Sequence, residues 1–154
     1  MRFFFAGLVL GVTMPGLAQQ TPHREKASVF VELAGNAAFG ATVNVEARVH
    51  PHVALRAGIG NDFYTSTMVV PAQVVFMSSA RRSAIEVSAG VTVAFEDSRY
   101  TGNWNWDGVK PFFTGFAGYR YQAPGGFLFR LGVVPLLWTN GHIPWVALSL
   151  GYTH

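Results

Sequence analysis

Residues 84–95, AIEVSAGVTVAF, decide the fold. Apolar residues alternate there with residues that are polar or small. Alternation with a period of two, rich in β-branched residues, is typical of a β-strand whose two faces lie in different media. The apolar row is Ile85, Val87, Ala89, Val91, Val93 and Phe95, and the other row is Glu86, Ser88, Gly90, Thr92 and Ala94.

Seven further segments of strand length surround this stretch and are separated from one another by turn residues. An even number of strands, each of roughly nine to eleven residues, is typical of the smallest outer-membrane barrels. We therefore predict an all-β fold, an eight-stranded antiparallel transmembrane β-barrel with short turns at one end and longer loops at the other. The predicted strands are residues 28–35, 41–49, 53–60, 68–76, 84–95, 112–122, 127–138 and 145–152.

The composition points away from an ordinary soluble domain. The chain has 154 residues, enough for one domain, and 50% of them are hydrophobic. Only 12% are charged, against roughly 25% in typical soluble domains. The formal net charge is +3, but the basic residues are scattered, so nucleic acid is not an expected partner. The chain contains no cysteine, so a disulfide framework and a thiolate zinc site are both excluded.

The N-terminus predicts secretion. Arg2 precedes an apolar run over residues 3–12, and small residues at 16–18 offer a cleavage site. That run is about ten residues long, short of the roughly 20 that a membrane-spanning helix needs. We predict a signal peptide over residues 1–18, a short periplasmic tail over 19–27 and a barrel over 28–154, which places the protein in the outer membrane of a Gram-negative bacterium.

Residue size indicates which face of each strand points inward. The polar face carries glycines that suit the narrow lumen of an eight-stranded barrel better than a solvated exterior. The other face forms a continuous apolar band that suits lipid. The glycines are Gly58, Gly60, Gly90, Gly118, Gly132 and Gly151, and the band includes Val43, Val45, Leu55, Ile59, Val74, Leu131, Val133, Val146 and Leu150.

The same phase places seven charged side chains in the lumen. In so narrow a space, charges need ion pairs and hydrogen bonds, so we predict a salt-bridge network that plugs the barrel. The short turn at residues 123–126 brings Arg120 and Arg130 opposite each other, where they would share carboxylates from other strands. The network is predicted to comprise Glu32, Glu46, Arg48, Arg56, Glu86, Arg120 and Arg130.

The C-terminal third carries a resemblance. Residues 118–137, GYRYQAPGGFLFRLGVVPLL, and 144–154, PWVALSLGYTH, resemble a family of small outer-membrane β-barrel proteins and, more loosely, the OmpA-type eight-stranded barrel. The resemblance implies insertion by the barrel-assembly machinery, which reads the apolar residues of the last strand and usually a terminal Phe. This chain departs from that pattern by ending in His154. The family implies no catalytic residue, no cofactor and no ligand.

The long outer loop, residues 96–110, is the candidate recognition surface. Its aromatic and acidic residues, Tyr100, Trp104, Trp106 and Asp107, suit a platform for sugar, peptide or another cell surface, with the extracellular ligand unknown. The interpretation that we favour is that they anchor the hairpin at the lipid headgroups.

Chemical motifs are scarce. His50 and His52 flank a proline but lack a third metal ligand, and His142 has only Thr139 as a nearby hydroxyl.

We predict a non-enzymatic barrel with a structural or surface-interaction role, with no catalytic residue, metal or cofactor. Its expected partners are outer-membrane lipid, lipopolysaccharide and the barrel-assembly machinery. Two alternatives stay open: a lipid-modifying enzyme of the lipid A deacylase or acyltransferase type, and a narrow passive pore.

Overall fold

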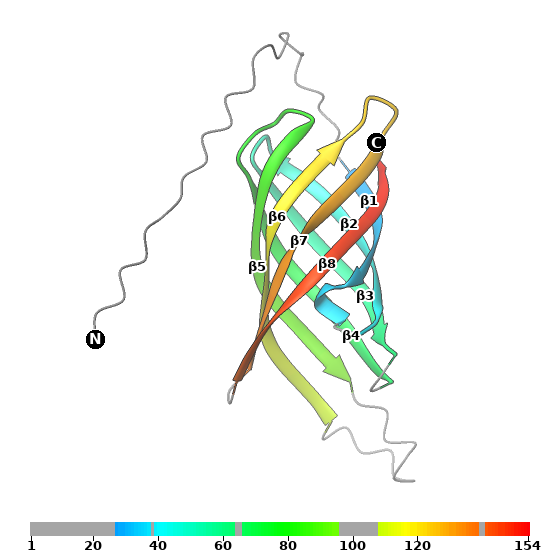
Figure 1. The fold of residues 1–154 in the computed structure, drawn as a ribbon, viewed down its shortest axis with the longest axis vertical. Helices are drawn as coiled ribbons and strands as arrows, with labels where there is room; N and C mark the ends of the chain where they lie inside the picture. Colours follow the sequence, from blue (N-terminus) through cyan, green and yellow to red (C-terminus); the bar gives the residue numbers. More distant parts are fainter. Residues whose placement is uncertain (1–26, 38, 64–65, 96–107, 139–140) are drawn as a thin grey trace, which may run out of the picture.

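Eight antiparallel strands form a closed barrel in sequence order, as the predicted fold required (Figure 1). The structure is a computed structural model that describes residues 27–37, 39–63, 66–95, 108–138 and 141–154. The predicted signal peptide and nearly all of the predicted tail lie outside these residues. The strands are β1 (Ala27–Ala34), β2 (Ala41–His50), β3 (Val53–Asp62), β4 (Thr67–Met77), β5 (Ser83–Phe95), β6 (Val109–Gln122), β7 (Phe127–Trp138) and β8 (Gly141–Thr153).

Two strands, β6 and β8, begin three and four residues earlier than predicted, the largest differences at any strand start. The prediction started β6 at residue 112 and β8 at residue 145, in each case just after a proline. The pairing continues through both prolines, because Pro111 lies opposite Val93 and Pro144 lies opposite Pro135. A proline removes one ladder hydrogen bond, and the pairs on either side of it hold the strand in place.

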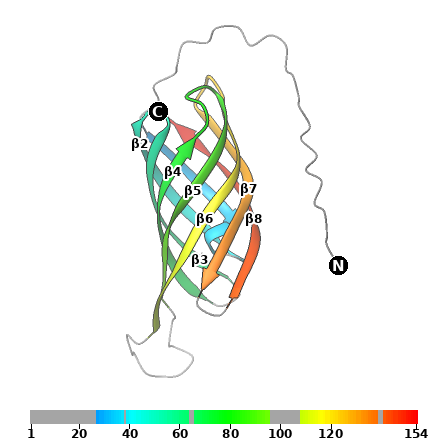
Figure 2. The same ribbon diagram turned by 90° about the vertical axis from the view of Figure 1, so that its left-hand side faces the viewer.

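Short turns gather at one end of the barrel, together with the C-terminus (Figures 1 and 2). They join β2 to β3, β4 to β5 and β6 to β7, and Gly126 adopts a left-handed φ of 87° in the last of them. The seam between β1 and β8 closes at this end through two backbone hydrogen bonds between Ala27 and His154, of 2.8 and 3.1 Å. The barrel therefore has no open edge in its described part.

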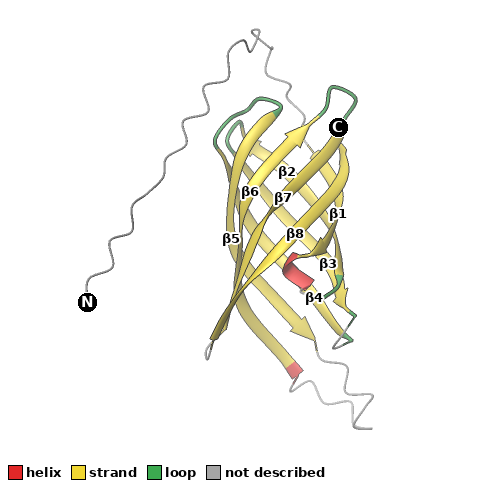
Figure 3. Cartoon of the chain, in the orientation of Figure 1, coloured by secondary structure: helices red, strands yellow, loops and turns green. Residues whose placement is uncertain are grey.

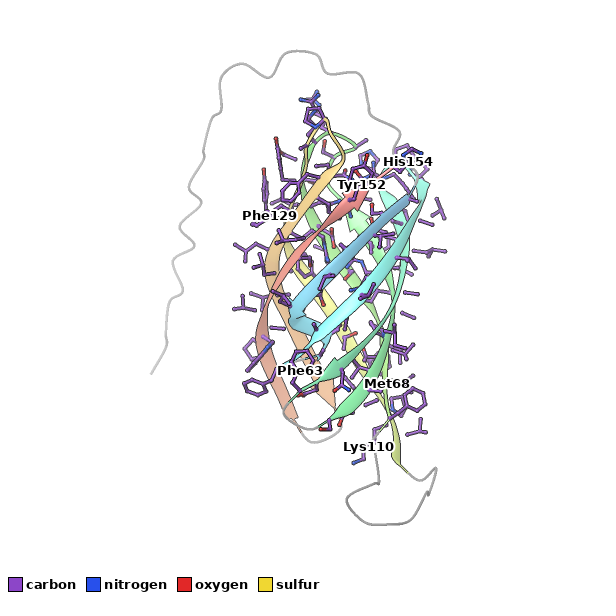
Figure 4. The ribbon with its side chains drawn as sticks, turned by 90° about the vertical axis from the view of Figure 1, so that its right-hand side faces the viewer. Phe63, Met68, Lys110, Phe129, Tyr152 and His154 are labelled. Carbon is purple, nitrogen blue, oxygen red and sulfur yellow. The ribbon has the colours of Figure 1, made fainter. Side chains whose placement is uncertain are left out.

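The outer face is apolar on every strand. Large hydrophobic side chains alternate with buried ones and point away from the barrel (Figure 4). One outward residue from each strand, in chain order, is Val29, Val43, Leu55, Val74, Ile85, Phe113, Leu131 and Val146. The alternation in the sequence therefore gives the barrel an apolar outer face and a chemically different interior.

Exposed aromatic side chains lie toward both ends. Tyr152 and His154 lie at the short-turn end, and Phe63, Met68 and Lys110 at the opposite end (Figure 4). Further exposed rings toward the short turns are Phe76, Tyr119, Tyr121 and Phe127, and those toward the long loops include Phe39 and Phe113.

A 3₁₀ turn, η1 (Gly35–Ala37), follows β1 and was not predicted (Figure 3). All three of its residues are buried, and η1 contacts β1, β2, β3, β4, β7 and β8, so it lies inside the barrel. Ala34 and Gly35 have φ values of 58° and 64°, which turn the chain inward after β1. No helix in the described residues is long and apolar enough to span a membrane.

The interior is less uniformly polar than the sequence pattern suggested. Apolar clusters lie inside along with the charges: Ala54, Val75, Met77 and Ala84 form one, and Phe116, Val134 and Ala147 form another. Apolar side chains lie beside the charges because a closed lumen must be filled, and large apolar side chains fill it.

Candidate functional site

Six charged side chains from six strands meet inside the barrel, and we call them the ion-pair cluster. All are 4% exposed or less, so they are almost completely removed from solvent. The alternation of each strand directs them inward, as the sequence predicted. The cluster consists of Glu32 on β1, Glu46 on β2, Arg56 on β3, Glu86 on β5, Arg120 on β6 and Arg130 on β7.

Glu86 lies at the centre of this cluster. Its Oε1 accepts hydrogen bonds from Arg56 Nη2 at 2.6 Å and from Arg130 Nη2 at 2.7 Å. Its Oε2 accepts from Arg130 Nε at 3.1 Å and from Arg120 Nη1 at 3.3 Å. One carboxylate therefore bridges three guanidinium groups, which are the strongest class of protein hydrogen-bond donor for it.

The other two carboxylates complete the cluster. Glu46 accepts from Arg56 Nη2 and from Arg120 Nη1, each at 2.6 Å. Glu32 accepts from Arg130 Nη1 at 3.3 Å. With three acids and three bases, the cluster is formally neutral, which is the condition under which buried charge is tolerated.

Arg120 and Arg130 are cross-strand partners on β6 and β7, as the short turn between these strands predicted. Two like charges at this spacing repel each other. Glu86 contacts both of them, while Glu46 and Glu32 each contact one. The predicted interior Arg/Glu network is thereby confirmed, including the sharing of carboxylates from other strands.

Neutral polar groups extend the network to the two remaining strands. Gln73 on β4 accepts from Arg56 Nη1 at 3.3 Å, and Ser149 on β8 accepts from Arg130 Nη1 at 3.0 Å. Asn36 of η1 donates twice to Glu32 Oε1, from its backbone at 3.1 Å and from Nδ2 at 2.9 Å. Each of the eight strands thus contributes a hydrogen-bonding side chain to one connected set.

Two aromatic rings in the interior were missed by the sequence reasoning. The Arg130 guanidinium carbon lies 4.7 Å from the centre of the Phe30 ring and 4.3 Å from the centre of the Phe116 ring. Cation–π contacts of this kind stabilise a desolvated guanidinium. The signal was present, because Phe30 shares the inward phase of Glu32 and Phe116 shares that of Arg120.

Arg48 lies between the ion-pair cluster and the short turns. It is half-buried, and its Nη2 donates to Met77 Sδ and to Gln122 Oε1, each at 3.3 Å. The seventh predicted lumen charge is therefore inside the barrel but closer to the short-turn end than the other six.

The remaining candidate residues are not brought into this site. Within the described part of the chain, no group of three or more His, Asp or Glu side chains could hold a metal ion. His52 Nδ1 instead lies 2.9 Å from the carbonyl oxygen of Met77, as a turn contact. The recognition-loop residues Tyr100, Trp104, Trp106 and Asp107 lie outside the described residues, as do Thr139 and the side chain of His142.

Comparison with known proteins identifies the architecture. The sequence matches no protein-family profile and no curated protein. A solved structure from the de novo design of transmembrane β-barrels is similar, with 19% identity, a TM-score of 0.61, and coverage of 88% of this chain and 98% of that chain. The solution NMR structure of the de novo designed protein TMB2.3 is also similar, with 17% identity, a TM-score of 0.51, and coverage of 84% and 94%. At such identities the likeness concerns the fold, which is a closed eight-stranded barrel.

Proposed function

We propose that this chain is an outer-membrane β-barrel with a non-enzymatic structural or surface-interaction role and an interior closed by the arginine–glutamate network. The observation that carries the proposal is the inverted distribution of side chains: apolar residues cover the outside, and charged residues fill the inside. A protein dissolved in water places its charges the other way round.

The outer face supports a lipid environment. Ile85 is 58% exposed and Val146 is 61% exposed, and similar side chains surround the barrel. A continuous apolar surface of this kind marks contact with a membrane or with other proteins. The longest strands, of 13 and 14 residues, would extend about 43 to 46 Å at roughly 3.3 Å per residue. At a tilt of about 45°, that length crosses a hydrocarbon core of roughly 30 Å.

The interior supports a closed barrel in preference to a pore. The ion-pair cluster is almost fully buried, apolar side chains pack beside it, and η1 lies inside the barrel as well. An eight-stranded barrel has room for side chains and little else. We therefore propose a structural role in preference to a passive pore.

The outer membrane is proposed from the predicted leader, because closed barrels of this type follow a secretory signal in Gram-negative bacteria. Lipopolysaccharide would then contact the long-loop end, and phospholipid the short-turn end. β8, with Val146, Leu150 and Tyr152 facing outward, would present the apolar row that the barrel-assembly machinery reads.

A lipid-modifying enzyme is the second candidate, and no observation on the described residues favours it. It would need a nucleophile, a base and an orienting acid within hydrogen-bonding reach on the lipid-facing side. All three acids of the ion-pair cluster instead face the interior and contact arginines. Mass spectrometry of lipid A from cells with and without the protein tests this candidate: unchanged lipid A is the result expected here.

The membrane proposal is tested by fractionation and by electrophoresis. We expect the protein in the outer-membrane fraction, and we expect the detergent-folded protein to migrate differently before and after boiling, as stable barrels do. A protein that stays soluble without detergent and shows no shift on boiling would contradict the proposal. Conductance in planar bilayers tests closure, because a stable open channel would contradict the plugged interior.

A further inference from the structure

The interior on the short-turn side of the barrel contains buried hydrogen-bond donors that lack acceptors. Arg120 Nε and Gln122 Nε2 make no hydrogen bond within the described part of the chain. Arg120 is 1% exposed and Gln122 is 6% exposed, so bulk water does not reach these groups. Both residues are on β6, two positions apart, and both face the interior. Unpartnered buried donors are rare and call for an explanation.

The carboxylates of the ion-pair cluster are already engaged. Both oxygens of Glu86 and both oxygens of Glu46 accept hydrogen bonds from arginines. Glu32 Oε1 accepts from Asn36, and its Oε2 accepts from Arg130. Every carboxylate oxygen of the cluster therefore has a donor, and none is turned toward the unpartnered groups.

The surroundings of the two donors are also rich in donors. Arg120 Nη2 donates to Ser28 Oγ at 3.2 Å, and Arg48 Nη2 donates to Gln122 Oε1 at 3.3 Å. The second contact fixes the orientation of the amide, because the opposite orientation would point the NH₂ group of Gln122 at a guanidinium. The Arg48 guanidinium group thus lies beside an amide whose N–H groups are unused.

We propose that the two unpartnered donors, Arg120 Nε and Gln122 Nε2, bind a small monovalent inorganic anion of the halide type. A halide accepts hydrogen bonds and donates none, which matches a site made of donors. A water molecule would bring two O–H donors that need acceptors of their own. The anion would complete the hydrogen bonding of the interior on the short-turn side, and this inference does not depend on the proposed membrane location.

Bromide provides a direct test. Crystals of the detergent-solubilised protein grown with sodium bromide in place of chloride should show an anomalous difference peak at hydrogen-bonding distance from Arg120 Nε and Gln122 Nε2. A water molecule at this position, or bromide bound only at the outer surface, would overturn the inference.

A second measurement uses Gln122→Glu, which supplies a covalently attached negative charge of nearly the same shape. We expect the thermal unfolding midpoint of the natural protein to rise when chloride replaces gluconate at constant ionic strength, and we expect the variant to lose this dependence. Gln73→Glu is the matched control, since Gln73 Nε2 already donates to Asn36 and Thr114, and it should retain the dependence. Equal chloride dependence in the natural protein and Gln122→Glu would overturn the inference, as would its absence from the natural protein. If Gln122→Glu does not fold, the bromide crystals decide.

Discussion

Replacing Glu86 with Gln keeps the shape of the side chain and removes the charge that three arginines share. Glu86 lies 2.6 Å from Arg56 and 2.7 Å from Arg130, and all the charged residues around it are almost fully buried. Removing one partner of a buried ion pair costs about 3–5 kcal/mol, because the remaining charge stays desolvated. Three guanidinium groups would then share two carboxylates, so we expect Glu86→Gln to lower the free energy of unfolding by about that amount.

A double-mutant cycle with Arg130→Met isolates the pair. The double variant again has equal numbers of acids and bases in the cluster, so it should be less destabilised than the sum of the single variants. Arg130 contacts Glu86 through both Nε and Nη2 but contacts Glu32 through Nη1 alone, at 3.3 Å. The coupling should therefore be about 2–3 kcal/mol with Glu86→Gln and smaller with Glu32→Gln.

The assay is reversible urea unfolding of the protein refolded into detergent or lipid vesicles, followed by tryptophan fluorescence. Arg81→Gln is the control, because Arg81 is exposed in a short turn, and it should change stability little. Coupling below about 0.5 kcal/mol in both cycles would refute the reasoning, since these charges would then be hydrated independently and the pore hypothesis would regain weight.

Three further outcomes are expected. Val91→Arg should cost about 2–4 kcal/mol in vesicles and Val91→Leu little; equal effects of the two changes would mean that Val91 does not face lipid. Gly118→Ala should destabilise by about 1–3 kcal/mol, because a Cβ there would meet the Leu131 carbonyl oxygen, whereas Gly125→Ala, with no atom within 4 Å, should be neutral in the same titration. Asn36→Ala should cost about 1–3 kcal/mol by removing side-chain hydrogen bonds that hold η1; an unchanged unfolding midpoint would mean that η1 is held by its backbone alone.

Most of the fold follows from local patterns. Alternation in residues 84–95 identifies β5 without any tertiary information, and the Pro-Gly-Gly sequence at 124–126 marks the turn between β6 and β7. The extension of β6 back to Val109 was missed because Pro111 breaks the pattern, and only its pairing with β5 holds that part of the strand. η1 carries no periodic signal, since a three-residue turn is held by the barrel that surrounds it.

The sequence predicts which residues belong to the ion-pair cluster, but it does not predict which of them contact one another. The phase of each strand shows that Glu32, Glu86 and Arg130 face inward. The pairing of carboxylates with guanidinium groups depends on the stagger between strands and on how far each side chain extends across the lumen. A local sequence pattern does not determine either of these. Arg130 reaches Glu32 past the intervening β8, a contact that exists only because the sheet closes on itself.

The contact between Glu32 and Arg130 requires a closed barrel, and this requirement affects how the chain assembles. Glu32 and Arg130 lie on strands that flank β8, so their contact forms only when the seam between β1 and β8 is joined. In the membrane proposed above, an intermediate sheet with an open seam would hold charges and backbone groups without partners in an apolar medium, which is costly. Partly closed sheets should therefore be scarcely populated, and insertion should proceed as one cooperative event whose last bonds also neutralise the interior.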